Sequence, residues 1–147
     1  MMDLTNHFSL DEFTVSRTAI KKGIKNIPSA TARSKIMDLC VEVLEPIRYN
    51  FGPVVISSGY RSPQLNKAIG GSGSSQHCKG EAVDFTCPRS DNKQVARWIE
   101  SMLLFDQLIL EYYPGGWIHL SLAAKNRKQV LRAVKKRGKT VYLGGLD

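Results

Sequence analysis

Residues 107–121, with the sequence QLILEYYPGGWIHLS, decide the fold class of this chain. The runs 107–112 and 117–121 are rich in aliphatic and aromatic residues, as strands are, and the Pro-Gly-Gly sequence at 114–116 predicts a turn between them. Strands joined by so short a turn are antiparallel, whereas parallel neighbours need a long crossover. The helical patterns lie mostly before this hairpin. The sequence therefore predicts an α+β fold, a small antiparallel sheet with helices packed on it.

The clearest helical pattern covers residues 30–49, where apolar side chains recur at the i, i+3, i+4 spacing of one buried stripe. Ser29 is suited to cap this helix, and Pro46 is expected to bend its last turn. The glycine-rich segment 70–75 is expected to be a loop that leads to His77. Further patterns predict short helices over 9–13 and 63–68, a helix that includes 95–103, and strands over 53–57, 81–87, 129–134 and 140–144.

The length and composition are those of one ordinary globular domain, which we expect to span residues 1–147. The chain has 147 residues, 42% hydrophobic and 23% charged, which disfavours disordered, collagen-like and coiled-coil proteins. No stretch approaches the ~20 apolar residues of a membrane span, and the first residues lack the pattern of a secretory signal peptide. The three cysteines form neither a disulfide framework nor a CxxC metal motif, which indicates synthesis in a reducing compartment.

The positive charge of the chain is concentrated in one segment. Lys and Arg number 21 against 13 acidic residues, a net charge of +8, and eight of the basic residues with no acid lie between Lys125 and Lys139. This basic segment fits either a solvated face or a binding surface for a polyanion, such as nucleic acid or an anionic cell-wall polymer. Composition alone does not separate these partners.

Two histidines and one aspartate have a pattern typical of a metal site. His77 precedes Asp84 by seven residues, so that a loop imidazole and an inward strand carboxylate can converge. His119, on the second strand of the hairpin, can face the same way and supply a third ligand. Two imidazoles and one carboxylate suit Zn²⁺ and leave a fourth position for water. Each residue alone is also compatible with an ordinary structural role.

Three strings in this order resemble a known family: SSGYRS at 57–62, SxHxxGxAxD at 75–84 and WIHLS at 117–121. They are similar to the zinc D-Ala-D-Ala carboxypeptidase family, which includes bacterial D,D-peptidases, vancomycin-resistance dipeptidases and phage endolysin peptidases. That family shares its fold with the hedgehog signalling domain. Segments 7–13 and 43–48 resemble the short phage and prophage members, so the resemblance covers nearly the whole chain.

The resemblance implies roles for particular residues. The family's zinc ligands fall on His77, Asp84 and His119, and the arginine that faces the substrate and its developing oxyanion falls on Arg61. Ser75 matches a serine at the rim of the substrate pocket. The implied substrate is a peptide bond that involves D-amino acids in peptidoglycan stem peptides, and the implied setting is a phage or prophage protein. Such a protein is made in the host cytoplasm and acts on the wall after release, or is a virion component.

The general base is less clear from the resemblance. Several relatives have an acid three residues before the third ligand, where this chain has Gly116. This chain resembles short relatives that have a QLIxE strand, in which the glutamate corresponds to Glu111. The resemblance implies that Glu111 takes the proton of the attacking water. Asp106 is the other acid between Glu100 and His119 and is the alternative base.

The sequence therefore predicts a zinc metallopeptidase, of D,D-carboxypeptidase or endopeptidase type, that hydrolyses peptidoglycan stem peptides. Glu111 and Arg61 are the expected catalytic residues, and Ser75 and Arg61 the expected substrate-binding residues. Wall polymer is a further expected partner through the basic segment, with no membrane partner. A non-catalytic zinc-containing binding module of the same fold is the alternative, and a nucleic-acid-binding domain is a weaker one.

Overall fold

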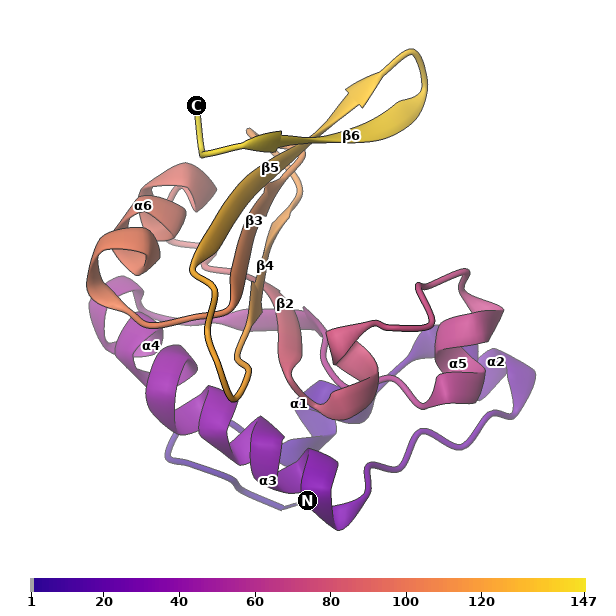
Figure 1. The fold of residues 1–147 in the computed structure, drawn as a ribbon. Coiled ribbons are helices and arrows are strands. Elements are labelled where there is room, and N and C mark those ends of the chain that lie inside the picture. The colour runs from indigo at the N-terminus through magenta and orange to yellow at the C-terminus, as the bar shows by residue number, and fades with distance from the viewer. Residues whose placement is uncertain (1) are drawn as a thin grey trace.

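The computed structural model describes residues 2–147, which form an α+β fold with a six-stranded sheet (Figure 1). The elements follow one another as α1 (Leu10–Thr14), α2 (Arg17–Lys22), α3 (Ala30–Leu39), the π-helical η1 (Cys40–Leu44), α4 (Glu45–Phe51), β1 (Val55–Ser58), α5 (Pro63–Ala68), the 3-10 helix η2 (Gln76–Lys79), β2 (Ala82–Thr86), α6 (Asn92–Met102), β3 (Gln107–Glu111), β4 (Trp117–Ser121), β5 (Gln129–Lys136) and β6 (Lys139–Gly144). None of the helices in these residues has the length and apolar composition needed to cross a bilayer.

The sheet has the strand order β1-β2-β4-β3-β5-β6, and one of its five pairings departs from the antiparallel prediction. Strands β3 and β5 are parallel, whereas the other neighbours are antiparallel. The hairpin already covers one edge of β3 with β4, so the chain after β4 crosses to the free edge. There the N–H groups of Lys128 and Gln129 bond to the carbonyl oxygens of Phe105 and Asp106, so β5 begins beside the start of β3 and runs with it.

The apolar stripe predicted over 30–49 lies against the sheet as the main helical contribution to the core. Ile36, Leu39, Val43 and Ile47 on this stripe have no exposed surface. They pack in one cluster with the apolar face of the sheet, which includes Val83 and Phe85 on β2 and Leu108 and Leu110 on β3. Burial of this cluster, at roughly 1.5–3 kcal/mol for each large side chain, fixes which face of β2 remains for polar residues.

The predicted single helix is divided by a wider turn before Pro46. The N–H of Glu45 bonds to the carbonyl oxygen of Cys40, five residues back, and α4 then begins with Pro46 in its first turn. Proline has no N–H to donate and its ring displaces the carbonyl of the preceding turn, so the helix cannot continue regularly through Pro46. Proline thus acts at the start of a new helical segment rather than bending the last turn of the old one.

The short N-terminal helix was correctly predicted from its cap. Ser9 and Glu12 form a capping box at the start of α1, and Phe8 and Phe13 on either side are 2% and 1% exposed.

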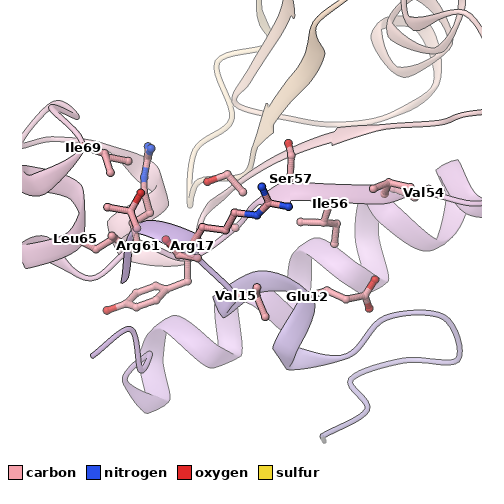
Figure 2. Close-up of a pocket in the computed structure, with 15 residues that line it drawn as sticks. Glu12, Val15, Arg17, Val54, Ile56, Ser57, Arg61, Leu65 and Ile69 are labelled. Atoms are coloured by element: carbon pink, nitrogen blue, oxygen red, sulfur yellow. The ribbon is translucent and has the colours of Figure 1, made fainter. Parts of the chain in front are cut away.

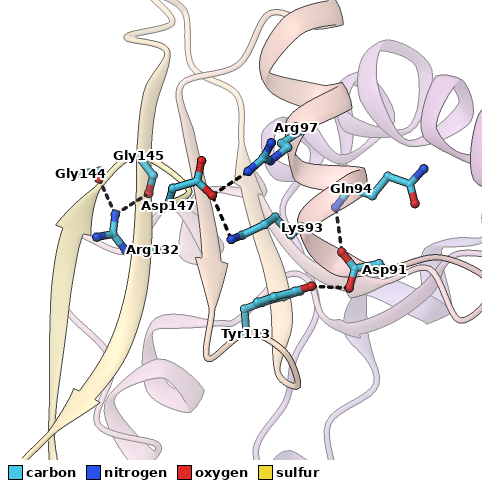
Figure 3. A network of polar contacts seen from close by, with 9 residues as sticks. All are labelled: Asp91, Lys93, Gln94, Arg97, Tyr113, Arg132, Gly144, Gly145 and Asp147. Atoms are coloured by element: carbon cyan, nitrogen blue, oxygen red, sulfur yellow. Dashed lines mark hydrogen bonds and ion pairs between the residues drawn. The ribbon is translucent and has the colours of Figure 1, made fainter.

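The C-terminal residue is held on the other side of the molecule. The Asp147 carboxylate accepts from Lys93 (3.0 Å) and Arg97 (2.6 Å) on α6, as Figure 3 shows. Both ends of the chain are therefore joined to the core elements.

Candidate metal centre

His77 lies on η2, a turn of 3-10 helix at a place where the sequence predicted only the end of a loop. The Ser75 hydroxyl accepts a hydrogen bond from the N–H of His77 (3.2 Å) and so begins the turn. Gly80 ends it with a φ of +76°, and a Cβ at this position would collide with the backbone carbonyl of Ala32 on α3. The turn is thus packed directly on a helix, and glycine alone fits at its end.

The imidazole of His77 is 3% exposed and has one ring nitrogen already engaged. Nδ1 lies 2.7 Å from the carbonyl oxygen of Gly59, and because a carbonyl can only accept, Nδ1 donates this bond. The other nitrogen, Nε2, faces Oδ2 of Asp84 at 3.4 Å. This is the arrangement in which a backbone carbonyl fixes the tautomer of a metal-binding histidine and leaves Nε2 free.

Asp84 and His119 are direct partners across the β2–β4 pairing, which brings together residues 35 positions apart. Nδ1 of His119 lies 2.8 Å from Oδ1 of Asp84. Burial raises the pKa of the Asp84 carboxyl, but the adjacent imidazoles of His119 and His77 outweigh it, and the pKa lies well below its usual range. The carboxylate is therefore charged at neutral pH, as a metal ligand must be.

His77, Asp84 and His119 form the one group of three potential metal ligands found in residues 2–147, here called the metal-binding group. Their ligand atoms all lie within 4.8 Å of one another. Two neutral imidazoles and a carboxylate are a donor set that fits Zn²⁺, with three protein ligands and a fourth position for a reacting molecule. The structure thus brings together the residues His77, Asp84 and His119 that the sequence singled out.

Glu111 lies diagonally across the hairpin from His119. In the β3–β4 register His119 pairs with Ile109, which is two residues before Glu111. Side chains two residues apart on a strand project from the same face, so Glu111 and His119 lie on one face of the sheet. Diagonal neighbours in an antiparallel pair are ~7–8 Å apart at Cα, which long side chains can span. Burial, together with the charge of Asp84, raises the pKa of the Glu111 carboxyl. A carboxylate of raised basicity therefore lies beside the metal-binding group without belonging to it.

Gly116 lies at a position of the hairpin turn that has no room for a side chain. Its φ is +68°, and a Cβ would collide with the carbonyl oxygen of Glu111. The turn between β3 and β4 is thus closed so tightly that a side chain at position 116 has no room. An acid near the metal-binding group must then come from another position, and Glu111 is the one that the structure provides.

Arg61 and Ser75 form the opposite side of the site. The N–H of Arg61 bonds to the carbonyl oxygen of His77 (3.1 Å), and Nη2 donates to the Ser75 hydroxyl (3.2 Å). The Nε atom of Arg61 is buried and has no hydrogen-bond partner within residues 2–147. Arg61 lines the site cavity, and its guanidinium has further N–H donors besides the one bonded to Ser75 that can bind an oxygen of a substrate.

Asp106, the alternative base, has a different position and role. Its carboxylate accepts from the backbone N–H, Nε and Nη2 of Arg127 and from Nε2 of Gln76, at 2.9–3.0 Å. The hydrogen bonds from Arg127, which outweigh the effect of burial, hold the pKa of Asp106 at about 2. A carboxylate so occupied is a poor proton acceptor. Asp106 instead joins the start of β3 to the turn that carries His77.

One open cavity of about 480 Å³ is lined by the predicted site residues His77, Asp84, His119, Glu111, Arg61 and Ser75. Of the nearby aromatic residues Tyr60, Tyr112, Tyr113 and Trp117, only Trp117 lines it. Tyr142 on β6 and Arg127, which the sequence did not single out, also line the cavity. The strand pattern of 140–144 predicted β6, but no local signal showed that β5 and β6 extend the sheet beside β3.

A larger cavity, of about 700 Å³, lies apart from this group between β1 and the residues around α1 and α2 (Figure 2). Val15, Val54 and Ile56 are among its lining residues, and Arg61 is shared with the first cavity. No other cluster of potential metal ligands was found in the described residues.

Comparison with models of known protein families gives a match over most of the chain. The family model described as Peptidase M15 matches residues 6–121. This range includes all the site residues predicted from the sequence. The match ends with the last residue of β4, so β5 and β6 lie beyond it. No curated protein matches the chain.

Proposed function

Because the chain belongs to the Peptidase M15 family, a family of zinc-dependent metallopeptidases, we propose that it hydrolyses a peptide bond in peptidoglycan stem peptides. The proposed zinc ligands are His77, Asp84 and His119. One observation carries the proposal: the proposed ligand group, a carboxylate of raised pKa and the guanidinium of Arg61 line the same cavity. A metallopeptidase needs these three components, and a module that only binds zinc does not.

In the proposed reaction each residue has a defined task. A bound zinc ion would polarise the scissile carbonyl and lower the pKa of a water molecule to ~7. The Glu111 carboxylate accepts a proton from the attacking water as the water oxygen bonds to the carbonyl carbon. The same proton then passes to the leaving amine as the C–N bond breaks. Arg61 donates to the carbonyl oxygen while negative charge develops on it, and Ser75 holds the guanidinium in place.

The test is incubation of the zinc-loaded protein with purified peptidoglycan, with and without a chelator. New amino and carboxyl termini are identified by mass spectrometry, and Glu111→Gln serves as the matched inactive control. Chelator-sensitive release of new termini is the expected result, and their identity separates endopeptidase from carboxypeptidase action. Absence of new termini despite stoichiometric zinc would favour the non-catalytic module instead. Binding to DNA with a steep dependence on salt, again without new termini, would favour a nucleic-acid-binding domain.

We also propose that the basic segment from Lys125 to Lys139 binds anionic cell-wall polymer. Lys136, Arg137 and Lys139 are exposed around the β5–β6 turn. Replacing these three by Gln should reduce sedimentation with cell walls at low salt and weaken its salt dependence, because exposed charges act over a Debye length of ~10 Å. Hydrolysis of a short soluble stem peptide should not change. Lys135 is retained in this variant because its ammonium donates to Thr140.

The predicted phage or prophage origin and release from a host cytoplasm remain predictions. The peptidoglycan assay on walls of different bacteria bears on the target cell but not on the origin of the protein.

A further inference from the structure

The hairpin formed by β5 and β6 adds two strands to the sheet beyond the residues matched by the family. It pairs with β3 through β5, and its turn projects away from the helices (Figure 1). Arg61 follows β1 at one edge of the sheet, and β6 is the strand at the other edge. The cavity that contains the metal-binding group is lined from both sides, by Arg61 and by Tyr142 of β6. A bound chain that lies across the strands can therefore contact both.

The strand register places Tyr142 on the face that carries the site. Trp117 pairs with Glu111, Glu111 with Ala133, and Ala133 with Tyr142, so the four residues form one row across four strands. Paired residues project from the same face of a sheet. Ala133, between Glu111 and Tyr142, is 1% exposed and has only a methyl group. Ala133 does not line the cavity, so the surface that this row offers to a ligand comes from Trp117, Glu111 and Tyr142.

Contacts at the end of β3 fix the position of this hairpin. The hydroxyl of Tyr112 lies 2.6 Å from the hydroxyl of Thr140, which also accepts from the ammonium of Lys135 (3.2 Å). The same ammonium lies 5.5 Å from the centre of the Tyr112 ring. Tyr142 is two residues after Thr140 on the same face of β6. The contact of Tyr112 with Thr140 therefore helps the backbone pairing to position Tyr142 relative to Glu111.

Tyr142 has features of a binding residue rather than a packing residue. Its side chain is 55% exposed although it lines the cavity, and its hydroxyl has no hydrogen-bond partner among residues 2–147. Burial and the nearby charge of Glu111 raise its pKa, so the phenol remains a donor at neutral pH. An exposed ring with a free donor, at the edge of a cleft, is suited to contact both an apolar side chain and a carbonyl oxygen.

We propose that Tyr142 binds the substrate peptide on the Glu111 side of the cleavage site, about three residues of extended peptide beyond Glu111. Glu111 on β3 and Tyr142 on β6 are separated by two strand spacings of ~4.8 Å, and an extended peptide advances ~3.3 Å per residue, so about three residues span this distance. The ring packs on a side chain of the peptide and the hydroxyl donates to one of its carbonyl oxygens. The inference rests on the proposed function, because it takes a peptide as the ligand. It predicts that long peptides use Tyr142 and that the shortest ligands do not.

The test compares two metal-directed probes by calorimetry on the zinc-loaded protein: acetohydroxamate, which occupies only the metal centre, and a tetrapeptide hydroxamate. Tyr142→Ala should weaken the tetrapeptide probe by roughly tenfold and Tyr142→Phe by a few-fold, the scale of lost ring contact and of one hydrogen bond. Acetohydroxamate affinity should stay within about twofold in both variants. The matched control is Tyr49→Ala, since Tyr49 on α4 is 90% exposed and does not line the cavity.

Wild-type affinity of Tyr142→Ala for the tetrapeptide probe would overturn the inference, and so would an equal loss for both probes, which indicates a disturbed metal centre. Failure of the proposed function has a different signature. A wild-type protein that binds neither probe and releases no termini from peptidoglycan would contradict both proposals. One that cleaves stem peptides while its Tyr142 variants bind normally would contradict only the role of Tyr142.

Discussion

Replacement of Asp106 by Asn should destabilise the fold by an amount that depends on pH. Asp106 is 3% exposed and accepts four hydrogen bonds, three of them from Arg127. A carboxyl whose pKa is about 2 in the folded state and ~3.9 in the unfolded state stabilises folding by roughly 2.6 kcal/mol at neutral pH. Because the Arg127 side chain is 57% exposed, solvent screening reduces the expected loss to about 2 kcal/mol.

The sign of the pH dependence follows from the lowered pKa. The contribution of Asp106 is complete above the unfolded pKa of ~3.9 and is lost as the pH falls through about 2. Asn has no charge to lose, so the difference between wild type and Asp106→Asn should be largest at pH 7 and roughly half as large at pH 3. Urea unfolding of the metal-free proteins at the two pH values measures it, because the other titrating groups are common to both proteins and cancel.

The matched control is Asp147→Asn. Asp147 also pairs with an arginine, Arg97, but its side chain is 71% exposed, so this pair should contribute little (Figure 3). Equal stability of Asp106→Asn and wild type at pH 7 would refute the argument. A difference of the same size at pH 3 would show that the loss comes from packing rather than from charge.

Three further changes test the site and its turn. Glu111→Gln keeps the size of the side chain but removes its basicity, so turnover should fall by ~10²-fold or more with zinc content unchanged; more than about a tenth of wild-type turnover would point to attack without a general base. His119→Ala removes one of three proposed ligands and should lose stoichiometric zinc in elemental analysis, and full retention would exclude His119 as a ligand. Gly116→Ala should lower the free energy of unfolding by more than Gly138→Ala, because both positions have a positive φ but only Gly116 lacks space for a Cβ. Equal losses in denaturant unfolding would show that the clash is relieved at no cost.

The parts of the fold that were predicted correctly have local signals. The Pro-Gly-Gly turn at 114–116, the Ser9–Glu12 capping box and the stripe over 30–49 are each contained in one short stretch of sequence, and the structure has the hairpin, the cap and the buried face. The approach of His77, Asp84 and His119 was predicted because a strand alternates faces at a fixed period, and the structure confirms that they meet. Their role as ligands stays a prediction.

The parts that were missed depend on contacts between distant residues. The parallel pairing of β5 with β3 begins where Arg127 meets Asp106, a contact that neither stretch reveals alone. Because that pairing was not predicted, Tyr142 could not be assigned to the cavity. The wider helical turn before Pro46 and the close approach of Gly116 to the carbonyl oxygen of Glu111 were also missed. Both depend on backbone dihedral angles that the residue types alone do not determine.

The pairing of Asp84 with His119 has a consequence for how the protein is made. The proposed ligand group is completed by residues 35 positions apart in the chain, on the paired strands β2 and β4. Contacts of such long separation are slow to form, and domains emerge from the ribosome from the N-terminus onward. A nascent chain that ends before His119 has no third proposed ligand, so capture of a metal by all three residues must wait until residue 119 has been synthesised. Metal uptake would then act as a late step that locks the sheet, because an ion that binds only the folded state stabilises it by mass action.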